Sequence, residues 1–373
     1  MRDFSKVKRI VVKVGTNLLT AENGINEERI KGICSQLADL KNMGYQVILV
    51  SSGAIGMGAK VLKHTNPVVH IPLRQAFAAI GNPMLMSAYQ RELDKYNIIA
   101  AQVLITKSVL NNRRSYVNLR SSVSTLLALG TIPIFNENDV VSTAEIGNVF
   151  GDNDRMSAMV ASKIEADLLI LLTDIDGIYT SNPKKDRDAT LIRCIDKITP
   201  EIMSYAKGKG SAFSTGGMKT KLYAAEIAQD GGCATIIASG YEPDVLTRVV
   251  GGEEIGTLIL PSKRLSARER WIMDASINGT IVVDDGAKRA LFENKSLLPS
   301  GIVSVKGNFN EKEVVLVTDR DGNGLLKAVT NFNSSDLRVL AGHKSSEIES
   351  ILGKGRRDVV FRPEDTSPVE HNV

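Results

Sequence analysis

The stretch Ile10–Asn17, with the sequence IVVKVGTN, is a short aliphatic run that ends at a glycine. Most residues of Ile10–Val14 are β-branched, which favours a buried strand, and Gly15 closes the run. A segment of helical periodicity follows over Glu27–Met43, and a second aliphatic run, Gln46–Val50, comes after it. Strand, helix and strand in this order predict parallel strands that are covered by helices.

The same alternation continues up to residue 260. Further strands are expected at Ile98–Leu104, Thr131–Phe135, Leu168–Leu172 and Thr235–Ala238. Further helices are expected over Arg74–Lys95, Ser115–Leu129, Asp154–Glu165 and Met218–Asp230. The predicted fold class is therefore α/β, a three-layer sandwich with a mainly parallel central sheet.

The pattern changes near Asn278. Short apolar segments are separated there by Gly- and Asp-rich turns, including Asp285-Gly286 and Asp321-Gly322, which is typical of a small β-rich domain. Its strands are expected at Thr280–Val283, Ile302–Val305, Val314–Thr318 and Leu325–Thr330. We expect one domain over residues 1–262, a linker over 263–277, a second domain over 278–356 and a loose polar tail over 357–373.

Composition narrows the class of protein. The chain has 373 residues, of which 43% are hydrophobic and 24% are charged, as in ordinary globular proteins. Its three cysteines have no metal-ligand spacing, which indicates reduced thiols, and no apolar run reaches the roughly 18 residues of a membrane span. A net charge of +4 favours a mixed solvated surface over a nucleic-acid footprint. We expect a cytoplasmic protein without a membrane segment.

Ligands of open parallel sheets bind beyond the carboxyl ends of the strands. Lys13 and Gly15 lie at the end of the first predicted strand, where a glycine lets backbone N–H groups approach an anion and a lysine supplies positive charge. The alternative is a simple strand-to-loop turn with a solvated lysine. The second strand leads into Ser51–Gly58 (SSGAIGMG), whose small residues predict a further group of N–H donors. The chain contains neither G-x-x-x-x-G-K-[ST] nor a G-x-G-x-x-G following that strand.

The strand expected at Thr131–Phe135 leads into a dense run of acids and amides. Asn136-Glu137-Asn138-Asp139 is followed by Thr143–Ile146 and by Gly151-Asp152-Asn153-Asp154. Burying so many polar groups is costly unless a ligand or hydrogen bonds satisfy them. Helix capping needs only one such residue, so a binding role is favoured over capping.

Two further motifs suit an anion. Thr173-Asp174 follows the strand expected at Leu168–Leu172, where a β-turn is the alternative reading. Thr215–Lys221 (TGGMKTK) opens a helix whose N-terminus attracts polyphosphate. The four histidines lie outside all these motifs. Lysines, glycines and carboxylates suit phosphoryl transfer, and a carboxylate acceptor with a pKa of roughly 4 would need no general base.

The motifs occur in the order found in a known family, and the sequence resembles the glutamate 5-kinases of the amino-acid kinase superfamily over residues 8–260. The matching pieces are Val11–Thr16, Ser51–Ile55, Asn136–Asp139, Gly151–Asp154, Leu171–Asp174 and Thr215–Lys221. Residues 278–356 resemble a PUA domain, best in Leu297–Ile302 and Lys306–Phe309.

The resemblance implies ATP-dependent phosphorylation of the side-chain carboxylate of L-glutamate to L-glutamyl 5-phosphate, the first step of proline biosynthesis. Mg²⁺ is implied as the counter-ion of ATP, with no protein ligand assigned to it. A homo-oligomer and feedback inhibition by proline are implied as well.

The resemblance also assigns roles by position. The catalytic residues would be Lys13 and Lys221, which neutralise charge on the transferred phosphoryl group, and Asp154, which holds the two lysines in place. Glutamate would be bound by Ser52, Asn136, Asp139 and Asn153. ATP would be bound by Lys13, Gly15, Gly53, Thr173, Asp174, Thr215, Gly216, Gly217, Met218, Lys219, Thr220 and Lys221.

Two alternatives stay open at this point. One is another kinase of the superfamily that acts on a different small carboxylate or a phosphate. The other is an RNA-binding protein, because PUA domains often bind RNA. Between Asn278 and Gly355, however, acidic and basic residues are equal in number, and Phe292, Phe309 and Phe332 are the only aromatic residues, which is little for a stacking surface.

Overall fold

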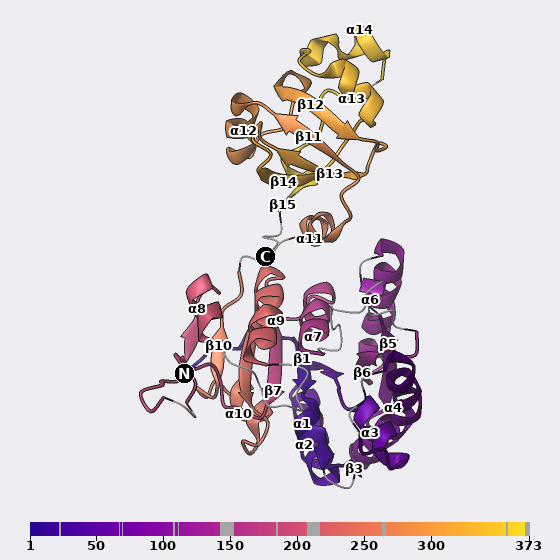
Figure 1. The fold of residues 1–373 in the computed structure, drawn as a ribbon, viewed down its shortest axis with the longest axis vertical. Helices are drawn as coiled ribbons and strands as arrows, with labels where there is room; N and C mark the ends of the chain where they lie inside the picture. The colour runs from indigo at the N-terminus through magenta and orange to yellow at the C-terminus, as the bar shows by residue number, and fades with distance from the viewer. Residues whose placement is uncertain are drawn as a thin grey trace. The chain divides into compact units, whose positions relative to one another are not determined.

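The structure is a computed structural model that describes residues 1–21, 24–66, 68, 70–106, 109–110, 112–141, 153–183, 186–206, 217–262, 266–355 and 357–369. The chain divides into two compact units, Met1–Arg264 and Leu265–Val373 (Figure 1). The described residues include no helix with the length and apolar character needed to cross a membrane.

The first unit is built on an eight-stranded sheet. In spatial order its strands are β5 (Ala100–Ile105), β6 (Ile132–Glu137), β4 (Gln46–Val50), β1 (Arg9–Val14), β7 (Leu168–Thr173), β9 (Ala234–Ser239), β10 (Thr257–Ile259) and β8 (Cys194–Ile195). Neighbouring strands are parallel except for the pair β9–β10. The short strands β2 (Thr20–Ala21) and β3 (Gly24–Ile25) form a separate hairpin. The sheet is thus mainly parallel, as predicted.

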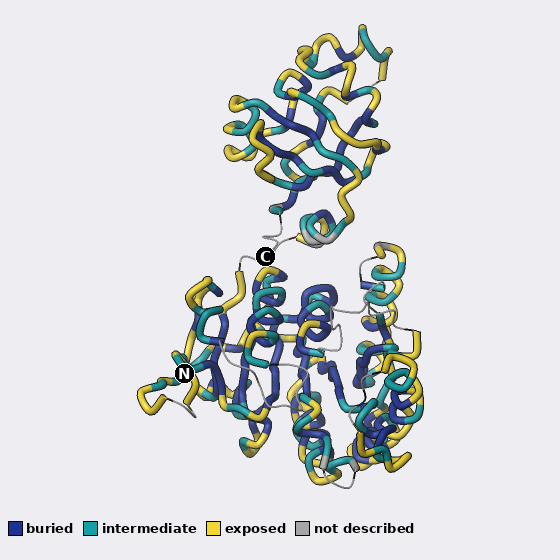
Figure 2. Tube along the Cα trace, in the orientation of Figure 1, coloured by how far each residue is buried: buried dark blue, intermediate teal, exposed yellow. Residues whose placement is uncertain are grey.

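Helices cover both faces of this sheet because its central strands are apolar on both sides. Along β1, Ile10, Val12 and Val14 belong to one hydrophobic core and Val11 belongs to the other. Figure 2 shows these inner strands as buried. The first core includes residues of α2 (Glu27–Asn42), α3 (Ala54–Val61), α4 (Ile71–Leu93) and α10 (Val245–Val250). The second includes residues of α6 (Arg113–Ala128), α7 (Asn153–Lys163) and α9 (Met218–Asp230). This arrangement confirms the three-layer α/β fold.

The remaining elements of the first unit are short. They are α1 (Thr16–Leu19), the 3₁₀ turn η1 (Asp94–Tyr96) and α8 (Pro200–Tyr205). The two- and three-residue strands β8 and β10 were not predicted from the sequence, because runs of that length carry too little periodicity.

The second unit contains a five-stranded sheet with the order β12-β11-β13-β14-β15. These strands are β12 (Ile302–Gly307), β11 (Gly279–Val283), β13 (Val314–Thr318), β14 (Gly324–Val329) and β15 (Thr366–Pro368). Its helices are α11 (Ala267–Asp274), α12 (Asp285–Phe292), α13 (Ser334–Leu340) and α14 (Ile348–Leu352), with 3₁₀ turns η2 (Pro299–Gly301), η3 (Ser345–Glu347) and η4 (Pro363–Asp365). The unit has its own core, which includes Phe332 and Phe361. A separate β-rich domain is therefore present, as predicted.

Three expectations for this region need correction. The segment expected to be a linker contains α11, which begins with a capping box formed by Ser266 and Glu269 and contacts β14 and β15. The segment expected to be a loose tail contributes β15, which pairs with β14, and Phe361, which is fully buried. Asp285-Gly286 does not form the expected turn, because the side chain of Asp284 accepts a hydrogen bond from the Ala287 N–H and α12 begins there.

Candidate active site

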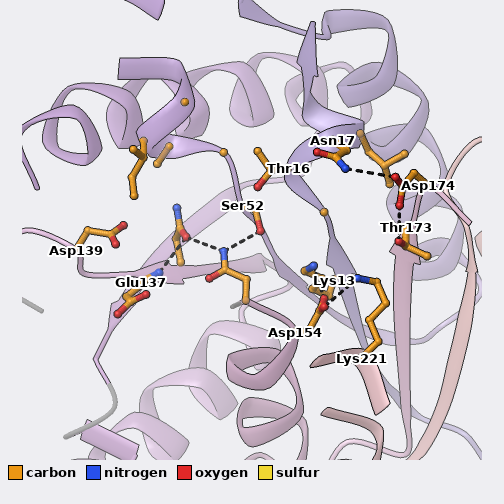
Figure 3. Close-up of a pocket in the computed structure, with 18 of the residues that line it drawn as sticks. Lys13, Thr16, Asn17, Ser52, Glu137, Asp139, Asp154, Thr173, Asp174 and Lys221 are labelled. Atoms are coloured by element: carbon orange, nitrogen blue, oxygen red, sulfur yellow. Dashed lines mark hydrogen bonds and ion pairs between the residues drawn. The ribbon is translucent and has the colours of Figure 1, made fainter. Parts of the chain in front are cut away.

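A cavity of about 270 Å³ opens beyond the carboxyl ends of the central strands of the first unit. Its walls come from the segments that follow β1, β4, β6 and β7, from the starts of α4 and α7, and from α9 (Figure 3). The lining residues are Lys13, Gly15, Thr16, Asn17, Leu18, Ser52, Gly53, Ala54, Ile55, Gly56, Arg74, Asn136, Glu137, Asp139, Asn153, Asp154, Thr173, Asp174 and Lys221. The sheet topology therefore joins motifs that lie up to about 200 positions apart in the sequence.

Two lysines share one carboxylate at the centre of the cavity. Lys13 on β1 pairs with Oδ1 of Asp154, and Nζ of Lys221 on α9 lies 3.1 Å from Oδ2 of the same residue. All three residues are buried, and Asp154 is only 1% exposed. Two ammonium groups beside one carboxylate leave a net positive charge, which favours an anionic ligand.

The charge of Asp154 follows from this pairing. Burial by itself would raise the pKa of the Asp154 carboxyl, but the charges of Lys13 and Lys221 act in the opposite direction and outweigh burial. The pKa of Asp154 is therefore held well below its ordinary value, and the residue is ionised at neutral pH.

Asn153 joins the polar residues on one side of the cavity. Its Nδ2 donates to the Ser51 carbonyl oxygen at 2.7 Å and to the Ser52 hydroxyl at 2.8 Å, and lies 3.3 Å from Oδ1 of Asn136. The amide of Asn136 in turn donates to Oδ1 of Asn82 at 2.8 Å. The ends of β4 and β6 and the start of α7 are thus connected by a single amide and hydroxyl network.

Asp139 lies on the side of the cavity away from the two lysines (Figure 3). It follows β6 in a turn in which the Val141 N–H donates to the Asn138 carbonyl oxygen. Burial raises the pKa of Asp139 to about 6, and the charge of Arg74 lowers it in part. A carboxylate in such surroundings is stabilised by a bound cation.

The opposite side of the cavity is formed by the segments that follow β7 and β1. The Thr173 hydroxyl donates to Oδ1 of Asp174 at 3.0 Å, and the Asn17 amide donates to Oδ2 at 3.3 Å. Gly15, directly after β1, exposes its backbone to the cavity without a side chain. Gly53 follows β4 and precedes α3, and its φ of +97° is a left-handed conformation that glycine adopts without strain.

The predicted site residues fall into three groups. The structure brings Lys13, Gly15, Ser52, Gly53, Asn136, Asp139, Asn153, Asp154, Thr173, Asp174 and Lys221 to this cavity. Gly217, Met218, Lys219 and Thr220 begin α9 without lining it, although the Thr220 hydroxyl lies 3.4 Å from Oδ2 of Asp154. Thr215 and Gly216, like Thr143–Ile146, Gly151 and Asp152, lie outside the described residues.

Sequence reasoning gave no role to several lining residues. Thr16, Asn17 and Glu137 lie within the predicted motifs, so their neighbours in the sequence pointed to them. Arg74 had no such signal, because it lies in α4 far from any motif and reaches the cavity through helix packing. Across the described part of the chain, no three His, Cys, Asp or Glu side chains are grouped to hold a metal ion.

Comparison with known proteins shows that a chain of this fold is an amino acid kinase. The model of the "Amino acid kinase family" matches residues 8–239, and the model of the "PUA domain" matches residues 279–352. The chain is 44% identical to the glutamate 5-kinase of Trichlorobacter lovleyi over 96% of both chains, and 44% identical to that of Methanococcoides burtonii over 96% of both chains. It is also 44% identical to the glutamate 5-kinase of Methanosarcina barkeri, over 99% of this chain and 98% of the relative. The chain therefore belongs to the glutamate 5-kinase family.

Proposed function

We infer that the chain transfers the γ-phosphoryl group of ATP to the side-chain carboxylate of L-glutamate, giving L-glutamyl 5-phosphate and ADP, the first step of proline biosynthesis. The observation that carries this inference is the pairing of Lys13 and Lys221 with Asp154 in the cavity. Similarity to glutamate 5-kinases over nearly the whole chain supports it and disfavours the two alternatives, a different acceptor and RNA binding. All the residues of this site lie in the first unit, to which we assign the kinase activity.

This phosphoryl transfer depends on neutralising the phosphate charge and on positioning the two substrates, and it requires no proton transfer from the attacking carboxylate. A carboxylate oxygen of glutamate attacks the γ-phosphorus, the bond from that phosphorus to the bridging oxygen breaks, and the electron pair leaves with ADP. The glutamate carboxylate is already ionised at neutral pH, so no general base is required. Lys13 and Lys221 would bind the phosphoryl oxygens, and Asp154 would fix the two ammonium groups.

Glutamate would lie on the side of the amide network. Ser52, Asn136 and Asn153 offer hydroxyl and amide groups that are already joined by hydrogen bonds, so their orientation changes little when a substrate binds. Asp139 would accept hydrogen bonds from the α-ammonium group, which supplies the cation that its surroundings favour. In this orientation the side-chain carboxylate of glutamate points toward Lys13 and Lys221.

ATP would lie on the opposite side. The backbone N–H groups of Gly15 and Gly53 would face phosphate oxygens, while Thr173 and Asp174 would contact the nucleotide. The segment 215–221 would complete this subsite at the start of α9, whose N-terminal N–H groups suit phosphate.

Mg²⁺ would accompany ATP. In kinase sites this ion is held largely by nucleotide phosphates and water, with few carboxylates. A carboxylate of that type lines the cavity at Asp174, on the side proposed for ATP, so the residues present fit a metal–nucleotide complex. The ion would supply further positive charge to the phosphate oxygens.

Three further properties are proposed because the chain belongs to the family. They are a homo-oligomeric state, feedback inhibition by proline, and a cytoplasmic location where ATP and glutamate are available. Light scattering of the purified protein and inhibition assays with proline test the first two directly.

The function is tested by incubating the protein with ATP, Mg²⁺, hydroxylamine and an amino acid. An acyl phosphate reacts with hydroxylamine to give a coloured hydroxamate. We expect hydroxamate from L-glutamate, and little or none from L-aspartate or N-acetyl-L-glutamate. Turnover of one of the other acids without turnover of glutamate would refute the assignment.

A further inference from the structure

The cavity contains one cationic side chain that the proposed chemistry does not use. Among the described residues that line it, the cations are Lys13, Lys221 and Arg74. Lys13 and Lys221 are held by Asp154. Arg74 comes from the first turns of α4 and has no counterpart in any of the sequence motifs.

Packing between α3 and α4 holds the helix that carries Arg74. The two helices contact each other closely at two glycines: a Cβ at Gly58 would overlap the Phe77 carbonyl, and a Cβ at Gly81 would overlap the Ala54 carbonyl. Residue 54 thus lies opposite residue 81 and residue 58 opposite residue 77, so the helices run antiparallel. Arg74 is one turn before Phe77 on α4, and it lines the same cavity as Ile55 and Gly56 of α3.

Arg74 lies near Asp139 in this cavity. Both residues line it, and the charge of Arg74 is strong enough at Asp139 to oppose the effect of burial on the pKa of that carboxyl. Figure 3 places Asp139 on the side away from Lys13, Asp154 and Lys221. That side of the cavity therefore presents the positive side chain of Arg74 together with the negative side chain of Asp139.

A free α-amino acid carries the complementary pair of charges. We propose that Arg74 binds the α-carboxylate of the substrate while Asp139 binds its α-ammonium group, so that the two residues together select an unmodified α-amino acid. Arg74 is then a specificity-determining residue, an assignment that rests on the proposed function. A guanidinium suits this role because its planar N–H groups match a carboxylate in a bidentate pair.

Two analogues separate the two contacts. Glutarate keeps both carboxylates of glutamate and lacks the ammonium group, while 4-aminobutyrate keeps the side-chain carboxylate and the amine and lacks the α-carboxylate. In Arg74→Gln we expect the KM for L-glutamate and the inhibition constant of glutarate to rise about 10- to 100-fold, the range for losing a charged hydrogen bond. The inhibition constant of 4-aminobutyrate should stay within about twofold of the wild-type value, because that ligand has no group for Arg74.

Control variants exclude a merely structural effect. The kcat with saturating glutamate and the KM for ATP should change little in Arg74→Gln, and Arg74→Lys should restore part of the glutamate affinity because it keeps the charge. Arg91→Gln removes a guanidinium from the same helix, where Arg91 pairs with Glu27 at the surface, and should alter none of these constants.

The outcomes are distinguishable. Turnover of glutamate by the wild-type protein, with an unchanged KM for glutamate in Arg74→Gln, would overturn this inference and leave the proposed function standing. An equal rise in the inhibition constants of glutarate and 4-aminobutyrate in Arg74→Gln would also overturn this inference. Absence of glutamate turnover by the wild-type protein would refute the proposed function, and this inference with it.

Discussion

Oδ2 of Asp154 lies 3.1 Å from Nζ of Lys221, across 67 positions of the sequence, and both side chains are more than nine-tenths buried. The other oxygen of the same carboxylate pairs with Lys13. Burying an isolated lysine is costly, so this shared carboxylate explains how two lysines are held in a buried position at the cavity. Their joint positive charge is the feature on which the proposed phosphoryl transfer depends.

Replacement of Lys221 by Ala should lower kcat about 100- to 1,000-fold, the usual effect of removing one charged contact to a transition state. The KM for glutamate should change little, because Lys221 lies away from the residues proposed to bind the amino acid. Steady-state assays with each substrate varied in turn measure both constants. Lys31→Ala, at an exposed position of α2, is the control and should behave like wild type. A raised KM with an unchanged kcat would contradict the proposed role.

Asp154→Asn should affect both stability and turnover. It leaves two buried ammonium groups facing each other without a counter-ion, which costs about 3–5 kcal/mol in free energy of unfolding. Urea denaturation measures this loss, and kcat should fall strongly because the lysines are no longer held. Glu27→Gln breaks the surface pair with Arg91 and is expected to change neither quantity appreciably. An Asp154→Asn protein as stable and active as wild type would show that the shared carboxylate has no such role.

The raised pKa of Asp139 should make glutamate binding depend on pH. Its pKa is raised to about 6 by burial, so the carboxyl gains a proton as the pH falls below 6 and can no longer pair with an ammonium group. The KM for glutamate should therefore be constant from pH 7 to 8 and rise toward pH 5.5, where the glutamate side chain is still ionised. Asp139→Asn should have a high KM with no such dependence. A wild-type KM that stays flat over this range would argue against ion pairing at Asp139.

Two glycine substitutions, one at the contact between α3 and α4 and one at an open position of α2, should change the stability of the protein in opposite directions. Gly58→Ala should destabilise the protein by at least about 1–3 kcal/mol, because the added methyl group overlaps the backbone of Phe77 and the helices must separate. Gly32→Ala, within α2, meets no atom within 4 Å and should stabilise the protein by about 0.5–1 kcal/mol through helix propensity. Chemical denaturation curves of the two variants test the difference. Equal stability of both variants would contradict the packing described here.

Much of the fold could be predicted because its strands are marked locally. Ile10–Val14 and Leu168–Leu172 are apolar on both faces and end in glycine, threonine or aspartate, so their order along the chain indicates a parallel sheet. The strands β8 and β10 escaped prediction because two or three residues carry no periodicity. The strand β15 escaped because Thr366–Pro368 is polar and becomes a strand only by pairing with β14.

Many of the residues that line the candidate cavity could also be predicted from the sequence. Lys13, Asp139 and Asp154 lie at strand ends or helix starts, where a sheet of this topology places its ligands, and family resemblance gave them expected roles. Arg74 could not be found in that way. Its place in the cavity depends on how α3 packs against α4, which involves Gly58 and Gly81 and leaves no mark around residue 74 itself.

An isotope measurement shows whether the side-chain carboxylate of glutamate attacks the γ-phosphorus of ATP. L-Glutamate labelled with ¹⁸O in the side-chain carboxylate is incubated with the protein, ATP, Mg²⁺ and hydroxylamine, and the released phosphate is analysed by ³¹P NMR or mass spectrometry. Hydroxylamine attacks the acyl carbon, so the phosphate departs with the oxygen that joined it to the carboxylate. We expect one ¹⁸O atom in each phosphate released in step with hydroxamate. Phosphate without ¹⁸O, released while ATP is consumed, would contradict it.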